Sequence, residues 1–405
     1  NNGTLAAQNG ALNVQTRLTG TGALQVAPTG SMSLANGGNT QSRLDLGGAG
    51  AAINVGNGNL TLNSDYTNAS AGSGNSFDRR AGITGVGQVV AGGDVTQTST
   101  GAGVSNGNTS NATLTIGNVR MGSTTAAEYR INNAGTTGPV LRGAIQTSVN
   151  GGNITDSRLS GAGVTAGNYN AGGPGGSTGS LAVNFTAATA GVIAPLTGQA
   201  VNLTSNFANI PDQKLNIVIG NGAAAYNTAV GNATPSPTVA LGNTRVGGTL
   251  GQALTVGNTA AAGAFSEDLN AGFGGSTGHA SGSGSVSGVL AGANNGSAMQ
   301  ASLDTSSAGA KSGTVTLNYQ TAGAVGGVSN GLGVTNVGSQ TISLGGNVYQ
   351  VAAGQLNTAP LNFGVVQVGQ SVSQVLSISN VASGAAGFVE DLNASFGATT
   401  GTGSS

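Results

Sequence analysis

Short stretches in which apolar and polar residues alternate recur along the whole chain, and glycine, asparagine or serine bounds most of them. Residues 181–185 (LAVNF) and 315–319 (VTLNY) are clear examples. A period of two is typical of a strand that buries one face. Glycine interrupts nearly every window that could be helical, so no helix of normal length is predicted. The pattern therefore predicts an all-β chain.

In residues 1–63 the apolar positions come in pairs that are two residues apart. The pairs begin at Leu12, Leu24, Met32, Leu44, Ile53 and Leu60. Alternate pairs, at Leu12, Met32 and Ile53, lie 20 and 21 residues apart, which is about one turn of a β-solenoid. Stacked turns would bury a narrow continuous core, with glycine and asparagine at the corners. The alternative is a low-complexity linker whose alternation arises by chance.

The alternation loosens between residues 64 and 111, where we expect an irregular β junction. Asp78, Arg79 and Arg80 are adjacent there and could form a local ion pair that fixes the junction. An exposed pair contributes roughly 0–1 kcal/mol, so it would orient the junction and add little stability.

One phrase occurs three times in the remainder of the chain. It reads LTIGNVRMG at 114–122, VALGNTRVG at 239–247 and LNFGVVQVG at 361–369. Its first glycines, Gly117, Gly242 and Gly364, are 125 and 122 residues apart. A fixed long period of this kind indicates an array of similar domains.

Each phrase is followed by an alternating stretch that ends in asparagine, at Asn133, Asn258 and Asn380. The second and third copies also share SEDLNAGFG at 266–274 and VEDLNASFG at 389–397. The first copy lacks this segment. The expected domains are a solenoid-like region with its junction at 1–110, followed by immunoglobulin-like domains at 111–235 and 236–357 and a partial one at 358–405.

The third copy shows what the phrase predicts at the level of strands. Phe363, Val366 and Val368 would share one face of a first strand, with a bulge near Gly364 that preserves the alternation. The partner strand would then end at Asn380, whose side chain would bond to the backbone in an Asx turn. Seven apolar residues are candidates for an assembly interface: Phe363, Val366, Val368, Val375, Ile378, Phe388 and Phe396.

The third copy ends at Ser405, before its counterpart of residues 315–319. A processed end, residues not seen, or strands supplied by another chain would each explain this. An incomplete sandwich exposes a groove that a strand of another subunit can fill. A head-to-tail contact that does not close produces a filament.

Composition narrows the functional class. Charged residues are 6% of the chain, compared with about 25% in average domains. The net charge is −1, which argues against nucleic acid as a partner. There is no cysteine, so disulfides and thiolate metal sites are excluded. No apolar stretch reaches the roughly 18 residues of a membrane span. The start Asn-Asn-Gly, without Met or signal peptide, is expected of a processed piece of a longer precursor.

With these motifs, residues 361–397 resemble the bacterial choice-of-anchor D domains, which are themselves similar to the immunoglobulin-like ASPM–SPD-2–Hydin domains. Residues 1–63 resemble the β-solenoid passenger regions of autotransporters and haemagglutinin-like proteins. The resemblance implies a β-solenoid followed by tandem immunoglobulin-like sandwiches, in a surface protein of a Gram-negative bacterium.

Residues that could support catalysis are scarce. His279 is the single histidine, and it lies among small residues. The string Gly-x-Ser-x-Gly occurs at 274–278 and again at 175–179, without the strand-to-helix setting that a nucleophile requires. Lys214 and Lys311 are the two lysines, too few for a basic catalytic site. No catalytic residue and no cofactor is assigned, and an enzyme is not expected.

The acidic doublets are the remaining candidate chemistry. Glu267 and Asp268, and again Glu390 and Asp391, could supply carboxylates to a calcium ion at a domain junction. The alternative is a polar turn that opens a strand and leaves its carboxylates in water.

Two functions fit the sequence. The first is a structural protein outside the cell or on its outer surface, which self-associates into a filament, sheath or surface layer, with strand complementation between subunits as one route. The second is an adhesin or stalk that binds a glycan or another cell through the loops expected at 162–180 and 274–295. Assembly of the purified chain alone would distinguish them.

Overall fold

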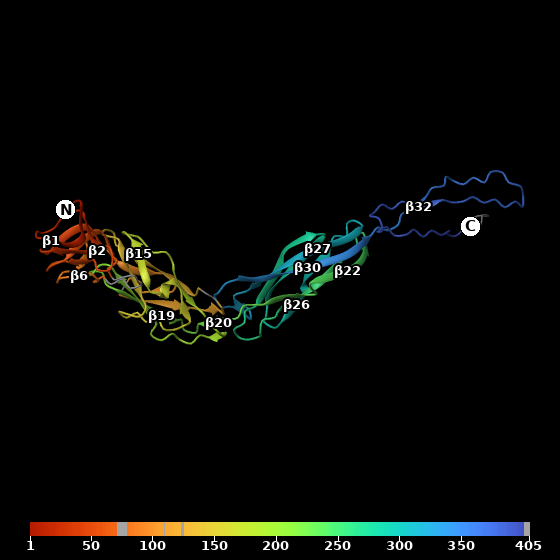
Figure 1. Cartoon of the computed structure of the whole chain (residues 1–405). Coiled ribbons are helices and arrows are strands. Elements are labelled where there is room, and N and C mark those ends of the chain that lie inside the picture. The colour runs from red at the N-terminus through yellow and green to blue at the C-terminus, as the bar shows by residue number, and fades with distance from the viewer. Residues whose placement is uncertain (71–78, 109, 123–124, 401–405) are drawn as a thin grey trace. The chain divides into compact units, whose positions relative to one another are not determined.

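The structure is a computed structural model of the 405-residue chain, and it describes residues 1–70, 79–108, 110–122 and 125–400 (Figure 1). Its contacts divide the chain into two compact units, Asn1–Tyr226 and Asn227–Ser405. In the described residues every regular element is a strand except one 3₁₀ turn, η1 (Ala162–Val164). The predicted all-β class is therefore confirmed.

The described residues 1–70 and 79–91 form a parallel β-solenoid. Its strands are β1 (Thr4–Val14), β2 (Ala23–Leu34), β3 (Asn39–Leu46), β4 (Ala52–Asn54), β5 (Leu60–Asn68), β6 (Ile83–Thr84) and β7 (Val89–Ala91). Leu12 lies opposite Met32, and Met32 lies opposite Ile53. These are the residues whose spacing predicted one turn, so the solenoid interpretation is confirmed. Leu24, Leu44 and the other paired apolar residues from position 24 to 62 are buried inside the turns.

A corner of the solenoid is built from stacked glycines. A Cβ atom on Gly58 would lie 2.6 Å from the Cα atom of Gly37 in one neighbouring turn. A Cβ atom on Gly87, in the other neighbouring turn, would lie 2.2 Å from the carbonyl oxygen of Gly58. Only a residue without a side chain permits so close a backbone approach.

The first sandwich completes the unit Asn1–Tyr226. Its strands are β8 (Gln97–Thr100), β9 (Val104–Ser105), β10 (Asn111–Ile116), β11 (Val119–Arg120), β12 (Ala127–Asn133), β13 (Leu141–Gln146), β14 (Leu159–Ser160), β15 (Gly167–Gly172), β16 (Leu181–Phe185), β17 (Gly191–Val192), β18 (Ala200–Ser205), β19 (Gln213–Ile219) and β20 (Ala224–Tyr226). The sheet β15-β13-β18-β19-β10-β9 and the sheet β14-β16-β12-β8 contribute to one core.

Ion pairs join the solenoid to this sandwich. The Arg142 guanidinium donates two hydrogen bonds to the Asp65 carboxylate, at 2.9 and 3.2 Å. Arg79 pairs with Asp212 at 2.5 Å. The local pair expected within residues 78–80 involves Asp78, which lies outside the described residues. Arg79 instead reaches across the junction, so its role in fixing the junction comes from a partner far away in the sequence.

The second sandwich lies in the unit Asn227–Ser405. Its strands are β21 (Gly231–Thr234), β22 (Thr238–Arg245), β23 (Gly251–Asn258), β24 (Leu269–Gly278), β25 (Ala280–Val289), β26 (Asn294–Leu303), β27 (Gly309–Thr321) and β30 (Thr335–Tyr349), and a small hairpin is formed by β28 (Ala324–Val325) and β29 (Val328–Ser329). The order is β21-β23-β26-β25-β24-β27-β30-β22. The register of β22 shifts between Ala240 and Asn243, around Gly242. This is the bulge that the repeated phrase requires.

Two segments expected to be loops contain strands. Residues 274–295 form most of the hairpin β24–β25, and residues 162–180 contain β15. Glycine and serine have little strand propensity of their own. The hairpin forms because β24 pairs with β27 along nine residues and β25 pairs with β26.

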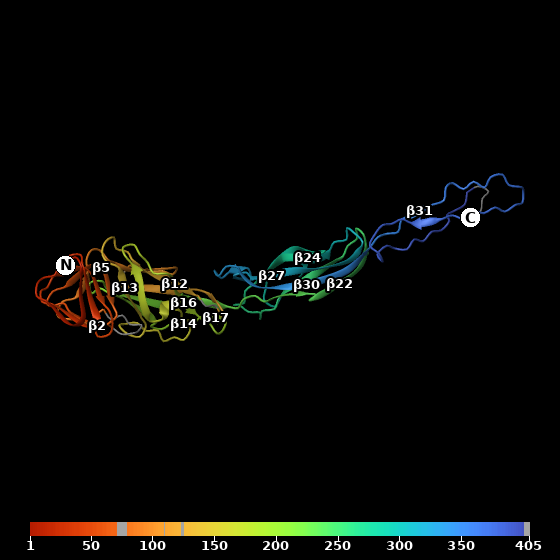
Figure 2. The same cartoon turned by 45° about the horizontal axis from the view of Figure 1, so that its top comes forward.

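After β30 the chain forms very little regular structure. β31 (Gly354–Leu356) pairs with β32 (Ile378–Asn380), and the remaining described residues up to 400 form loops (Figure 2). The first strand predicted through Phe363, Val366 and Val368 is absent. In the second sandwich the corresponding strand, β22, is held in its sheet by β30 alone. Among the described residues, no strand pairs with residues 361–369.

Candidate functional site

In each repeated unit, an asparagine at the end of a strand hydrogen-bonds to several backbone segments. In the second sandwich this residue is Asn258, which is 1% exposed and whose side chain makes four hydrogen bonds. Its Oδ1 atom accepts from the amides of Val230 and Ala260, at 3.1 and 3.3 Å. Its Nδ2 atom donates to the carbonyls of Glu267 and Val289, at 3.0 and 3.1 Å. One side chain thus fastens four backbone segments at the end of β23.

The same arrangement occurs in the other two copies. Asn133 accepts from Thr96 and Gly135 and donates to the carbonyls of Pro139 and Gly172. Asn380 forms the Asx turn predicted for it, with the Ala382 amide at 3.2 Å. It also accepts from the Ala353 amide and donates to the Glu390 carbonyl.

The first acidic doublet is buried and fully hydrogen-bonded. Glu267 is 0% exposed, and its carboxylate accepts from the Thr321 hydroxyl and from the Asn330 amide, the latter at 2.6 Å. Asp268 is 1% exposed, and its carboxylate accepts from the backbone amides of Gly326 and Gly327, at 3.0 and 2.8 Å. The expectation that these carboxylates lie in water is therefore wrong.

The nest that holds Asp268 depends on glycine. Gly326 and Gly327 have φ angles of +59° and +78°. In such a turn, successive backbone amides can point at one anion. Residues with a side chain rarely adopt a positive φ angle, so glycine is favoured at both positions. No group of three or more potential metal ligands occurs in the described part of the chain, and the doublet acts there as a hydrogen-bond acceptor.

The second acidic doublet, Glu390 and Asp391, is less buried than the first. Glu390 bonds Arg245 of the second sandwich at 2.7 Å, and Asp391 is exposed. Gln350, which follows β30, makes two backbone hydrogen bonds with the third copy. Its amide donates to the Phe388 carbonyl, and its carbonyl accepts from the Glu390 amide. Asn227 makes the same two bonds, to Phe265 and Glu267. The junction pattern therefore recurs after 123 residues, together with the doublet.

Most of the seven candidate interface residues lie exposed on the surface. Phe388 is half-buried against the Tyr349 ring, at 5.5 Å between centroids. The other six are exposed: Phe363, Val366, Val368, Val375, Ile378 and Phe396. Ile378 is 47% exposed, whereas Val256, 122 residues earlier, is 0% exposed. At this position the third copy exposes an apolar side chain whose counterpart in the second sandwich is buried.

Other candidate chemistry is dispersed. His279 lies exposed in the turn between β24 and β25, and its Nδ1 atom is 3.4 Å from the Ser312 carbonyl. Lys311 is buried and donates to the Ser307 hydroxyl at 2.9 Å. Residues 274–278 belong to strand β24, so this Gly-x-Ser-x-Gly string does not form the strand-to-helix turn that holds a nucleophile.

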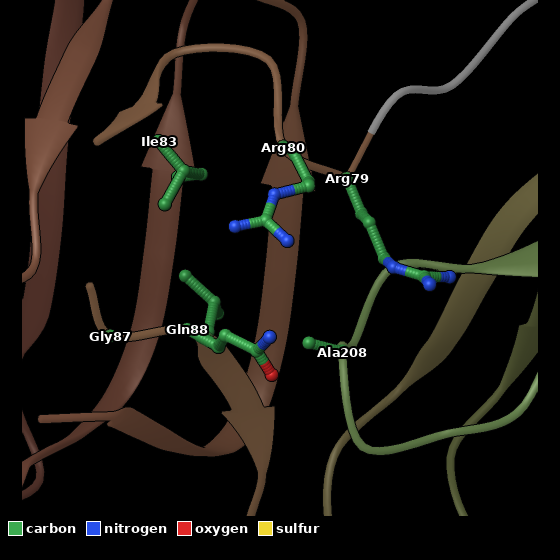
Figure 3. A pocket seen from close by; sticks show the side chains of 7 residues that line it. Arg79, Arg80, Ile83, Gly87, Gln88 and Ala208 are labelled. Carbon is green, nitrogen blue, oxygen red and sulfur yellow. The ribbon is translucent and has the colours of Figure 1, made fainter. Parts of the chain in front are cut away.

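A small pocket lies where the solenoid meets the first sandwich (Figure 3). Arg80 reaches into it near Ile83 and Gln88, and Arg79 turns away from it toward its partner Asp212. Its volume is about 60 Å³. Ligand sites usually span about 300–1,000 Å³, so this pocket is too small for an ordinary metabolite.

Comparisons with known proteins identify no family: no family model and no curated protein matches the chain. Among solved structures, the chain is similar to the adhesive subunit of the CFA/I fimbria of enterotoxigenic Escherichia coli. The sequences are 11% identical and the TM-score is 0.22, over 59% of this chain and 97% of that one.

Helices long and apolar enough to cross a membrane are absent from the described residues.

Proposed function

We propose that the chain is a structural protein of the cell surface or extracellular space, a subunit of a filament, sheath or surface layer, whose sandwiches carry tension along the chain. The observation that carries this proposal is the parallel pairing of the first strand of the repeated phrase with the last strand of the same sandwich. Low charge, the absence of cysteine and the serial repeat support a role outside the cell.

The second sandwich shows the geometry. β22 and β30 are parallel, with Thr238 opposite Ser343 and Arg245 opposite Tyr349. The chain enters β22 at Thr238 and leaves β30 at Tyr349, which is the opposite end of the ladder. Tension between these two points runs along the strands, so the ladder is sheared and its hydrogen bonds must yield together.

The first sandwich repeats this geometry with different residues. β10 and β19 are parallel and pair without a register shift from Asn111 opposite Lys214 to Ile116 opposite Ile219. The chain again enters and leaves at opposite ends of the ladder. Each hydrogen bond contributes only about 1 kcal/mol. Simultaneous loading of a ladder therefore gives a resistance that single bonds lack.

Two pulling directions on the second sandwich test the proposal. The chain has no cysteine, so handles can be attached uniquely to engineered ones. The pair Thr238→Cys and Val351→Cys shears β22 against β30. The pair Thr238→Cys and Ser343→Cys, both at exposed residues, opens the same ladder one bond at a time. We expect the shearing pair to unfold at a several-fold higher force in optical tweezers. Equal forces in the two directions would overturn the tension-bearing role.

A further inference from the structure

A hydroxyl, a carboxylate and a carboxamide meet in the interior of the second sandwich, beside the hairpin β28–β29. We propose that the side chains of Thr321 and Asn330 join in an intramolecular ester, and that Glu267 transfers the proton that this reaction moves. The inference goes beyond the proposed function, because it assigns a self-catalysed covalent modification and does not concern the pairing of β22 with β30.

Glu267 holds the two reacting groups on the two oxygens of one carboxylate. Its Oε2 atom accepts a hydrogen bond from the Thr321 hydroxyl, and its Oε1 atom accepts one from Nδ2 of Asn330, at 2.6 Å. The carbon to be attacked, Cγ of Asn330, is bonded to the nitrogen that Glu267 holds. Fixing two reacting groups beside each other in this way removes much of the entropic cost of bringing them together.

Backbone hydrogen bonds fix both ends of the segment that carries these groups. Thr321 is the last residue of β27, and its Oγ1 atom accepts from the Ala229 amide at 3.1 Å. Asn330 follows β29, and its amide donates to the Gly323 carbonyl at 2.9 Å. The Oδ1 atom of Asn330 accepts from the Leu332 amide at 3.0 Å. This last bond polarises the carboxamide and would stabilise the negative charge that develops on Oδ1 during attack.

The three groups are shielded from water. Glu267 and Thr321 are 0% exposed, and Asn330 is 7% exposed. Water would compete with the hydroxyl as a nucleophile and would hydrolyse the product, so its exclusion favours the ester. The buried hydroxyl also has the partner it needs, because a carboxylate within hydrogen-bond reach is the base that activates a threonine.

The reaction transfers the Asn330 acyl group from nitrogen to oxygen. Oγ1 of Thr321 bonds to Cγ of Asn330 while the Glu267 carboxylate takes the hydroxyl proton. The tetrahedral intermediate then collapses, the Cγ–Nδ2 bond breaks, and Glu267 returns the proton to the departing nitrogen. One ammonia leaves and one ester forms. Glu267 ends in the state in which it began, so no other reagent is consumed.

Intact-mass spectrometry of the whole chain tests the inference. We expect a mass below that of the sequence by one ammonia, about 17 Da. Thr321→Val removes the nucleophile and should restore the full mass. Glu267→Gln should leave most of the freshly purified chain at full mass, because loss of a general base slows such a step about 100-fold or more. Thr316→Val, at a half-buried threonine of the same strand, should keep the loss.

Digestion of the denatured parent chain locates the bond without any variant. Elastase cuts after small apolar residues such as Ala324 and Val325, and the fragments that contain Thr321 and Asn330 should then remain joined. The sequence Asn330-Gly331 can also lose ammonia, by closing onto its own backbone, but that product leaves the fragments separate.

Three results would overturn the inference: a parent chain of full mass, an ammonia loss that persists in Thr321→Val, or fragments that separate after digestion. A full mass would mean that the three side chains form a hydrogen-bond network only. The ester would close residues 321–330 and would not cross the β22–β30 ladder. Its absence therefore leaves the comparison of the two pulling directions unaffected, and the two proposals fail separately.

Discussion

Replacing Asn258 by alanine should unfold the second sandwich while leaving the unit Asn1–Tyr226 folded. The substitution removes four hydrogen bonds from a side chain that is 1% exposed. Each buried group left without a partner costs about 1–3 kcal/mol, so a loss of about 4 kcal/mol or more is expected. That is comparable to the whole stability of many domains, about 5–15 kcal/mol. Hydrogen-exchange mass spectrometry in increasing urea reports each unit separately and measures the loss.

Asn380→Ala is the matched control for this prediction. Asn380 has the same position in the third copy but is exposed, so water can replace its partners. A change below about 1 kcal/mol is expected for it. If the Asn258 and Asn380 variants behaved alike, the asparagine would not be the fastening point of the buried unit.

The second large effect is expected in the solenoid, from Gly58→Ala. The added Cβ atom would lie 2.6 Å from the Cα atom of Gly37 and 2.7 Å from the amide nitrogen of Gly38. Both are backbone atoms of the adjacent turn, so the turns must separate and the core between them must open. We expect a loss of about 2–4 kcal/mol, similar to other severe packing errors. Urea unfolding followed by exchange in residues 24–62 measures it.

Gly3→Ala provides the comparison within the same solenoid. The nearest atom to its added Cβ would be a side-chain oxygen 4.0 Å away, and its φ angle is not in the left-handed region. Its stability should stay within about 0.5 kcal/mol of the parent. A Gly58 variant as stable as the Gly3 variant would show that the turns are not stacked as closely as the structure has them.

The solenoid could be predicted in detail because its information is local. Each turn places two apolar side chains inside, so residues such as Leu12, Met32 and Ile53 repeat at the length of the turn. The asparagine that ends each repeated strand was also visible, as was the Asx turn of Asn380. What the sequence did not reveal is that Asn258 also reaches Val230 and Val289, because those contacts depend on how distant segments pack.

The hairpin β24–β25 and the acidic doublet were misjudged for related reasons. Residues 274–289 are rich in glycine and serine and lack alternation, and their strands form through pairing with β26 and β27. Glu267 and Asp268 are charged residues that the sequence places next to a turn. Their burial requires donors from Thr321 to Asn330, more than 50 residues away. Neither feature has a local signal.

The third copy shows the opposite case, a pattern that predicts strands which do not form. Phe363, Val366 and Val368 fit the alternation expected of one face of a strand, yet they remain exposed. The alternation shows which side chains could be buried if a strand formed. Whether the strand forms depends on a neighbouring strand with which it can pair.

Stretching the whole chain by its two ends in optical tweezers tests the central claim most directly. The two sandwiches should give two abrupt events of similar length, each releasing about 40 nm for roughly 120 residues. The solenoid should extend in smaller steps of about 7 nm, one turn of roughly 20 residues at a time, and residues 351–400 should extend without an event. Gradual extension of the sandwiches at low force, without abrupt events of about 40 nm, would contradict the account of two tension-bearing sandwiches.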